Sequence, residues 1–298
     1  MSAIVMHPAT AEALERFTRH HAHAVLVVGP EGVGKETCIR LLMRRLLDLP
    51  DNEALDKYPY IQALRIPKDK SSIGIDEIRE LQRFATLKLP GNSDTTQPRR
   101  MLVVYDAHTL TTEAQNALLK LLEEPPKDTI LLLSAAEEDA LLPTIRSRTQ
   151  RLQIHRPARA EVTDFFRDAG YDADAVKQTA MLSGGLPGLQ HALLQDEDHP
   201  LKQAVATART ILQADSFKRL CMVDELSKKK PDCLRLLFVL QHMSQAAIDQ
   251  AATGDNTEAS RKRLKQWHRI LTASYRAEQA LRGNTQAKLV LDDLLLAF

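Results

Sequence analysis

Residues able to hold a nucleotide phosphate stand in one run near the start of the chain. The run GPEGVGK fits the pattern G-x-x-x-x-G-K, with an apolar segment before it and an amphipathic segment after it. Glycines let backbone N–H groups curl around phosphate oxygens, and a helix start and a lysine add positive potential. The candidate phosphate-binding residues are therefore Gly29, Gly32, Gly34 and Lys35.

The residue after the lysine departs from this pattern. A serine or threonine is expected there because its hydroxyl binds the Mg²⁺ that accompanies the nucleotide. This chain has Glu36 instead, and Thr37 follows. A carboxylate can bind magnesium but also repels phosphates, and a shift of one residue turns a helical side chain by about 100°. We expect the loop to be kept and its metal chemistry to be impaired. The alternative is a loop kept only as the start of a helix.

A second acidic position follows the apolar run MLVVY. Asp106 stands where P-loop proteins hold magnesium, often through water. Many hydrolysing P-loop proteins place a glutamate immediately afterwards to polarise the attacking water, but here that residue is Ala107, followed by His108. A histidine can act as a base, yet two positions beyond the aspartate it is not expected to replace the glutamate. The pattern predicts that Asp106 is retained and that the catalytic acid is absent.

Strand and helix patterns alternate around these residues, which predicts an α/β fold with a parallel sheet. Apolar runs typical of buried strands occupy residues 25–28, 101–105 and 129–134, a further candidate strand covers 60–66, and a short one covers 151–154. Helical periodicity between them covers residues 9–20, 37–47, 75–86 and 112–124, with a polar loop over 91–100. After about residue 156 only helical patterns occur, over 160–169, 174–182, 187–195, from His199 onward with breaks at Lys230-Pro231 and Gly254-Asp255, and over 289–296.

Composition limits the class of protein. The 298 residues suggest about two domains, and 44% hydrophobic with 27% charged residues is ordinary for a globular chain. Lys and Arg number 40 against 39 Asp and Glu, so any contact with nucleic acid must be local. The cysteines, Cys38, Cys221 and Cys233, form no disulfide framework, and no signal-peptide pattern or long apolar run occurs. We expect a cytoplasmic protein with no membrane partner.

Two longer segments carry a family resemblance. TEAQNALLKLLEEPP and LLPTIRSRTQ, together with the GPEGVGK loop and the strand ending in Asp106, resemble the clamp-loader branch of the AAA+ P-loop family. Within that branch the pattern is similar to the delta-prime type of bacterial DNA polymerase III, strongly over about residues 20–190 and more weakly beyond. The resemblance implies an AAA+ nucleotide-binding-like α/β domain over 1–156, a small helical lid over 157–198 and an all-α collar for oligomerisation over 199–298.

The resemblance also implies a role for one arginine. A Ser-Arg-Cys motif in this family supplies an arginine finger in trans, to ATP held by a neighbouring motor subunit, and such a cation stabilises charge in the transition state. The motif here is Ser147-Arg148-Thr149, so the cysteine is replaced and the arginine stays. We expect Arg148 to be the finger, with Arg146 as the neighbouring candidate. The alternative is a surface arginine paired with a carboxylate.

Two further departures bear on cofactors. Many delta-prime relatives carry a four-cysteine zinc module, but residues 48–60 contain no cysteine, so no zinc site is expected. Active motors carry a second arginine sensor at the start of the lid's last helix, and residues 183–189 contain none. We expect no metal ligand set, ATP or ADP bound only weakly or as a vestige, and magnesium only where nucleotide binds.

These departures are similar to those of a stator, a subunit that does not turn over ATP but presents its finger. The resemblance implies a clamp-loader subunit in a hetero-oligomer whose partners are the motor and delta subunits, the sliding clamp and, through the complex, primed DNA. One alternative is a hydrolysing motor of the gamma/tau type, with Thr37 or Glu36 contacting magnesium. Another is an AAA+ scaffold of a different ring. The basic runs Lys228-Lys229-Lys230 and Arg261-Lys262-Arg263 are typical of solvated helix faces, and contact with DNA phosphates is their alternative.

Overall fold

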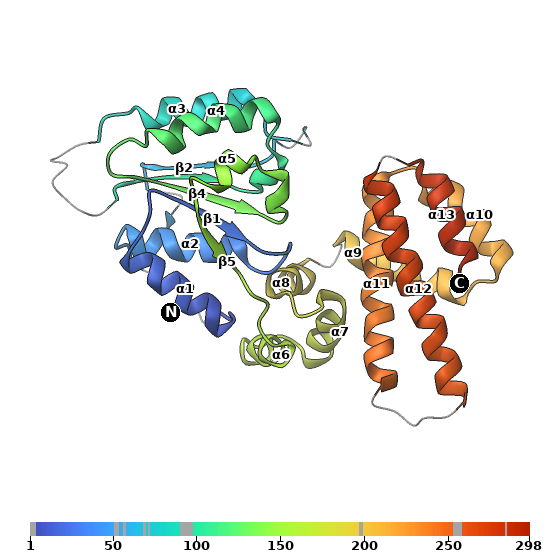
Figure 1. The fold of residues 1–298 in the computed structure, drawn as a ribbon. Coiled ribbons are helices and arrows are strands. Elements are labelled where there is room, and N and C mark those ends of the chain that lie inside the picture. Colours follow the sequence, from blue (N-terminus) through green and yellow to red (C-terminus); the bar gives the residue numbers. More distant parts are fainter. Residues whose placement is uncertain are drawn as a thin grey trace. The chain divides into compact units, whose positions relative to one another are not determined.

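The computed structural model describes residues 4–50, 54–55, 58–67, 70, 72–89, 98–196, 199–252, 258–283 and 285–298. The chain divides into two compact units (Figure 1). The first comprises residues 1–161 and 186–188, and the second comprises residues 162–185 and 189–298. The three-domain division at residues 156 and 198 stays a prediction.

A five-stranded parallel sheet in the order β2-β3-β4-β1-β5 forms the centre of the first unit. Its strands are β1 (Ala24–Val28), β2 (Ile61–Leu64), β3 (Arg100–Val104), β4 (Thr129–Ala135) and β5 (Gln150–Gln153). Every residue of β1, β3 and β4 is buried, as their continuous apolar runs predict. Because the strands are parallel, the segments that follow β1, β2 and β3 all leave from the carboxyl edge of the sheet.

Helices cover both faces of this sheet (Figure 1). One face is covered by α1 (Pro8–Arg19) and α2 (Lys35–Leu46), and the other by α3 (Ile75–Ala85) and α4 (Thr112–Glu123). The apolar stripe of α4, which includes Leu118, Leu121 and Leu122, joins Leu102 and Leu133 of the strands in one core. The short elements η2 (Ala107–Thr109), η3 (Glu138–Ala140) and α5 (Pro143–Arg146) lie in the connections.

Local signals set the starts of these helices. The Nδ1 atom of His7 accepts the N–H of Ala9, and Pro8 occupies the first turn of α1, where a missing N–H is tolerated. The hydroxyl of Thr111 accepts the N–H of Ala114 at the start of α4. At the other end α4 gives way to Pro125-Pro126, which cannot continue a helix.

The second unit is helical throughout its described residues. It contains most of α6 (Arg159–Asp168) and α8 (Pro187–Gln195), together with α7 (Ala173–Ser183), α9 (Pro200–Gln213), α10 (Ser216–Leu226), α11 (Lys230–Ala252), α12 (Glu258–Arg282) and α13 (Ala287–Leu296). The long helices α11 and α12 pack side by side (Figure 1). Their buried residues, among them Leu237, Leu240 and Leu281, share one core with Leu291 and Leu294 of α13.

The predicted fold class is confirmed: a parallel α/β sheet of P-loop type is followed by a helical region. The break predicted at Lys230-Pro231 lies a few residues too late: α10 ends at Leu226, and Lys230 and Pro231 open α11, where proline is tolerated in the first turn. A break that was not predicted separates α9 from α10, where Asp215 accepts the N–H of Lys218 at 2.8 Å. The predicted break at Gly254-Asp255, and most of the predicted loop over 91–100, lie outside the described residues. No described helix is long and apolar enough to cross a membrane.

Candidate functional site

Strand β4 joins the phosphate-type loop to the segment that carries Asp106. The N–H of Gly29 donates to the carbonyl of Ala135 at 3.2 Å. The N–H of Asp106 donates to the hydroxyl of Ser134, which is buried, at 2.9 Å. Since β4 lies between β1 and β3, these two bonds fix the loop and Asp106 at the same edge of the sheet. The structure therefore brings together the glycine-rich loop and the segment that carries Asp106, the two segments that the sequence pattern identified.

Glycines give the loop its path. A Cβ atom on Gly29 would lie 3.0 Å from a Val33 methyl carbon and 3.1 Å from the carbonyl oxygen of Ile154. Gly34 precedes α2 with φ +102°, a left-handed conformation that residues with a Cβ atom rarely adopt. Gly32 also has positive φ, and its carbonyl accepts the N–H of Gly188 at 2.8 Å. The sequence did not reveal this role of Gly188, which stands in the predicted helix over 187–195 and in the segment that lacks an arginine.

Lys35 is held by the loop itself. Its ammonium donates to the carbonyls of Gly29 at 2.8 Å and Pro30 at 3.1 Å, and the side chain is buried. Burial lowers the pKa of Lys35, and the negative charges of Asp106 and Glu31 partly offset that effect. The Lys35 ammonium thus joins the last residue of the loop to its first two residues.

Glu36 is engaged by a cation that the sequence analysis did not identify. Its carboxylate forms an ion pair with Arg65, the residue that follows β2. The Arg65 guanidinium lies 3.9 Å from the centroid of the Tyr105 ring, as a cation–π contact. The hydrogen bond with Glu36 is the main cause of the raised pKa of Arg65. The negative charge of Glu36, at the position expected to bind magnesium, is therefore neutralised by a residue of the same chain.

The position after Asp106 offers no acid. Ala107 is fully buried at the start of η2, and Asp106 adopts φ +51° before it. The ring of His108 is turned to the backbone, where Nδ1 accepts the N–H of Ala136 at 3.4 Å. Thr37 is exposed on α2. These positions offer neither the hydroxyl after Lys35 nor the acid after Asp106 that the pattern of a hydrolysing P-loop protein calls for.

Arg148 lies at the opposite edge of the sheet from the loop. It stands between α5 and β5, and β5 runs parallel to β1, with Gln150 opposite Val25 and Gln153 opposite Val28. The loop leaves the carboxyl end of β1, whereas Arg148 precedes the amino end of β5. The length of β5, roughly 13 Å at about 3.3 Å per residue, thus separates them along the strand direction. Arg148 is therefore distant from the loop of its own chain.

Arg148 and the neighbouring Arg146 each have their own acidic partner. The Nη2 atom of Arg148 lies 2.9 Å from Oε1 of Glu123, and Nη1 donates to the carbonyl of Thr144 at 3.1 Å. The Nη1 atom of Arg146 lies 2.7 Å from Oδ1 of Asp139. The structure thus places the predicted finger in an ion pair at the surface, which was the alternative interpretation. The two interpretations are compatible, because the side chain of Arg148 remains 38% exposed.

The residue that replaces the motif's cysteine has a local function. The hydroxyl of Thr149 donates to the carbonyls of Ile145 at 3.1 Å and Arg146 at 3.2 Å. These bonds satisfy carbonyl groups at the end of α5, a helix of only four residues. Ile145 is fully buried beneath them. Thr149 therefore fixes the backbone on both sides of Arg148.

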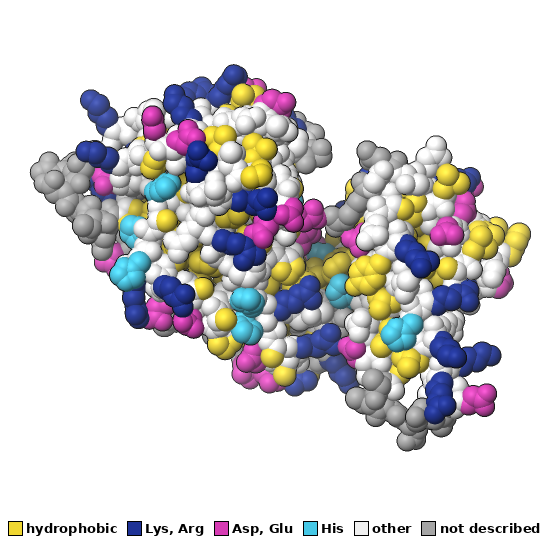
Figure 2. Space-filling view, viewed as in Figure 1, with side chains coloured by type: hydrophobic (Ala, Val, Ile, Leu, Met, Phe, Trp, Pro, Cys, Tyr) yellow, Lys and Arg dark blue, Asp and Glu magenta, His cyan; other side chains and the backbone are white. Residues whose placement is uncertain are grey.

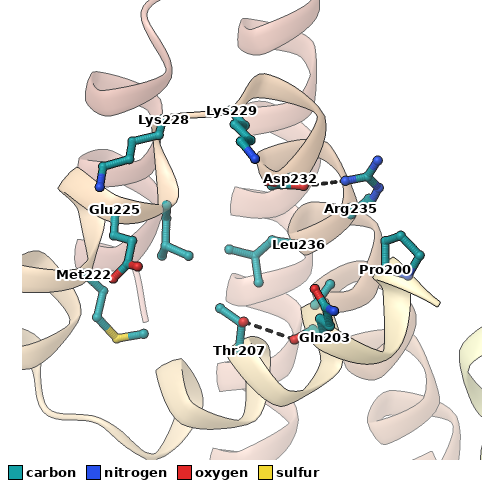
Figure 3. A pocket seen from close by; sticks show the side chains of 12 residues that line it. Pro200, Gln203, Thr207, Met222, Glu225, Lys228, Lys229, Asp232, Arg235 and Leu236 are labelled. Atoms are coloured by element: carbon teal, nitrogen blue, oxygen red, sulfur yellow. Dashed lines mark hydrogen bonds and ion pairs between the residues drawn. The ribbon is translucent and has the colours of Figure 1, made fainter. Parts of the chain in front are cut away.

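A separate hollow of about 570 Å³ lies in the second unit, among α9, α10 and the start of α11 (Figure 3). Lys228 and Lys229 stand on two sides of it, and Asp232 pairs with Arg235 there. Its lining residues include no histidine, cysteine or serine, so it carries no nucleophile of those types and no imidazole base. On the visible faces of both units, cationic and anionic side chains are interspersed (Figure 2). This mixture agrees with the net charge of +1.

The sheet order, the loop after β1 and the acid after β3 define a P-loop protein of the AAA+ type. The chain belongs to the family described as DNA polymerase III, delta subunit, whose family model matches residues 7–158, about half of the chain. This match covers the whole of the described sheet and both edges discussed above.

Relatives support the same family. The chain is 32% identical over 184 residues to the DNA polymerase III subunit delta' of Pseudomonas aeruginosa, which covers 56% of this chain and 54% of that protein. It is 33% identical over 181 residues to the DNA polymerase III subunit gamma/tau of Mycobacterium bovis, covering 55% of this chain and 30% of that protein. The match thus spans about half the length of the first relative and a third of the second.

A solved structure shares the fold. The chain aligns with a DNA polymerase III gamma subunit-related protein of Thermotoga maritima with a TM-score of 0.50 and 19% identity. The alignment covers 95% of this chain and 97% of that chain. At this identity the likeness shows the fold alone, and it extends through both units.

Proposed function

We propose that this chain is a delta-prime-like subunit of a clamp loader, which presents Arg148 in trans to ATP bound by a neighbouring motor subunit. The observation that carries the proposal is the position of Arg148 at the sheet edge opposite its own loop. A cation at that edge is too far from the phosphate site of its own chain to contact it, but a second molecule can approach it. A planar guanidinium that donates to a γ-phosphate stabilises transition-state charge, an effect worth about 10³–10⁵ in rate.

The chain's own loop is proposed to be a non-hydrolytic vestige that binds ATP or ADP weakly. Three features support this part. Glu36 is paired with Arg65, Ala107 stands in place of an acid, and the Lys35 ammonium is satisfied by loop carbonyls. Magnesium enters only with a bound nucleotide, and the donor set around Glu36 does not favour it.

The proposed partners follow from the family. The chain would join motor and delta subunits in a hetero-oligomer, help the assembly open a sliding clamp and place it on primed DNA, and do so in the cytoplasm. Its collar helices, α9 to α13, would supply the oligomeric contacts. Copurification of the tagged chain with a clamp and motor subunits tests this assignment, and its failure would favour an AAA+ scaffold of another ring.

A second candidate is a hydrolysing motor. The match to a gamma/tau relative and the retention of Lys35 and Asp106 favour it. Steady-state ATP hydrolysis by the purified chain with magnesium, compared with Lys35→Ala, separates the two. We expect no turnover above the Lys35→Ala control. Clear turnover that depends on Lys35 would establish the motor in place of the stator.

The trans role has its own test in a reconstituted complex. We expect Arg148→Ala to leave assembly intact, as followed by size-exclusion chromatography, and to lower the ATPase rate of the complex. Arg146→Ala is the matched control, because it removes the guanidinium that lies two residues before Arg148. An unchanged rate with Arg148→Ala would rule out the finger, and a loss confined to Arg146→Ala would transfer the role to Arg146.

A further inference from the structure

Two acidic residues end α4 where the helix dipole disfavours them. Glu123 is the last residue of the helix and Glu124 is its C-cap. The free carbonyl groups at a helix C-terminus carry partial negative charge, so cations are favoured there and carboxylates are not. Departures from such local rules collect at functional sites. The contacts of Glu123 give a reason for this departure.

Glu123 holds one side of the Arg148 guanidinium. Its Oε1 atom lies 2.9 Å from Nη2, while Nη1 donates to the carbonyl of Thr144 at 3.1 Å. A guanidinium carries five N–H donors in a fixed plane. These two contacts therefore orient the plane and leave other N–H groups for an anion. The side chains of Arg148 and Glu123 are 38% and 51% exposed, so the arrangement faces solvent.

Helix α4 also holds the backbone that carries Arg148. Near its start, Gln115 is buried; its Oε1 accepts the N–H of Leu142 at 2.7 Å, and its Nε2 donates to the carbonyl of Ala140 at 3.1 Å. Both partners lie in the segment that leads into α5. Helix α4 thus holds the segment that carries Arg148 at two points. Gln115, near the start of the helix, binds backbone groups of that segment, and Glu123, its last residue, binds the side chain of Arg148.

We infer that Glu123 is a positioning residue for Arg148: it orders the guanidinium before a neighbouring subunit's nucleotide arrives. This inference rests on the trans role of Arg148 proposed above. An arginine that is already ordered loses less side-chain freedom when it meets the phosphate. Glu123 itself does not contact the nucleotide. We expect the loss of Glu123 to change kcat of the motor site and not the KM for ATP, because Arg148 stabilises charge that develops in the transition state.

The test uses the reconstituted complex with primed DNA and the sliding clamp. We expect Glu123→Gln, which keeps the size and removes the charge, to lower kcat for ATP about two- to fivefold, since exposed ion pairs of this kind are weak. The KM for ATP should stay unchanged. Glu124→Gln removes the adjacent acid, and Asp139→Asn removes the partner of Arg146. Both matched controls should leave kcat unchanged.

A double-mutant cycle decides whether Glu123 acts through Arg148. In an Arg148→Ala background, Glu123→Gln should cause no further fall in kcat. A fall of the same size in both backgrounds, an equal fall in the controls, or a rise with Glu123→Gln would overturn the inference. If kcat is unchanged with Glu123→Gln but falls strongly with Arg148→Ala, the positioning role of Glu123 is wrong and the trans role of Arg148 is retained. If Arg148→Ala has no effect, the proposed function fails as well.

Discussion

Glu36 and Arg65 form an ion pair that joins the first turn of α2 to the end of β2 at the carboxyl edge of the sheet. Glu36 occupies the sequence position of a magnesium-binding hydroxyl, and Arg65 lies over the ring of Tyr105, next to Asp106. The acid that would repel a phosphate is thus neutralised by a residue of the same chain. This pair predicts how nucleotide affinity changes when Glu36 is replaced.

We expect Glu36→Thr to bind ATP about tenfold more tightly than the unaltered chain in the presence of magnesium, because Arg65 loses its acidic partner at this edge of the sheet and a metal-binding hydroxyl is gained. The gain should disappear when EDTA removes the metal. Titration with a fluorescent ATP analogue, with and without magnesium, measures both affinities.

Glu31→Thr is the control for this gain, because it removes the same charge from the same loop without placing a hydroxyl after Lys35. An equal gain with Glu31→Thr would show that net charge, and not the metal-binding position, limits affinity. Tight magnesium-dependent binding by the unaltered chain would contradict the prediction at once.

Gly29 predicts a stability effect. The Cβ atom of Gly29→Ala would meet Val33 at 3.0 Å and the backbone oxygen of Ile154 at 3.1 Å, so the loop or β5 must shift. Overpacking of this kind costs about 1–3 kcal/mol. Thermal unfolding followed by circular dichroism should show a melting temperature several degrees lower. Gly283→Ala, whose nearest contacts are at 3.5 Å, should melt within a degree or so of the unaltered chain. Equal shifts for both variants would contradict the packing argument.

The sequence predicted the sheet and the loop better than it predicted the surroundings of the loop. The strands β1, β3 and β4 are built around continuous apolar runs, so burial on both faces was evident from the sequence pattern. Strand β2 is only partly buried, and a single arginine after it gives no periodic signal. Arg65 is placed beside Tyr105 by the register that sets Leu64 opposite Val104. Gly188 reaches the loop through its hydrogen bond to Gly32. Such contacts join distant residues and depend on tertiary structure.

Arg100 predicts a second stability effect. Its guanidinium donates to the carbonyls of Ala85 and Leu87 at the end of α3, and the side chain is 2% exposed. A cation at a helix C-terminus satisfies carbonyl groups that have no partner in the helix. Burial lowers the pKa of Arg100, but arginine stays charged.

We expect Arg100→Ala to lower the free energy of unfolding by about 2–3 kcal/mol, because the buried carbonyl of Ala85 and the partly buried carbonyl of Leu87 lose a charged donor. Arg100→Lys should recover only part of this, since an ammonium lacks the planar fork that reaches both carbonyls. Urea unfolding followed by circular dichroism measures the change. Lys88→Ala removes an exposed cation from the same connection and serves as the control. A full recovery with lysine would show that charge alone matters at this position.

The three thiols should differ in reactivity. Cys221 is exposed on α10, whereas Cys38 and Cys233 are buried. Burial raises the pKa of Cys38 to about 12, and it also raises the pKa of Cys233, whose thiol donates to the carbonyl of Leu226 at 3.1 Å. The thiolate is the reactive form, so the raised pKa makes both buried thiols less reactive, and it keeps Cys38 protonated as the pH rises from 7 to 9.

At pH 8, Ellman's reagent should therefore modify about one thiol per folded chain rapidly, and all three in denaturant. Cys221→Ser should abolish the rapid phase, and peptide mapping by mass spectrometry should place the label on Cys221 in the unaltered chain. Raising the pH from 7 to 9 should leave Cys38 unlabelled, because its pKa lies well above that window. Rapid labelling of Cys38 in the folded chain would contradict the burial of this residue of α2 and, with it, the packing of that helix on the sheet.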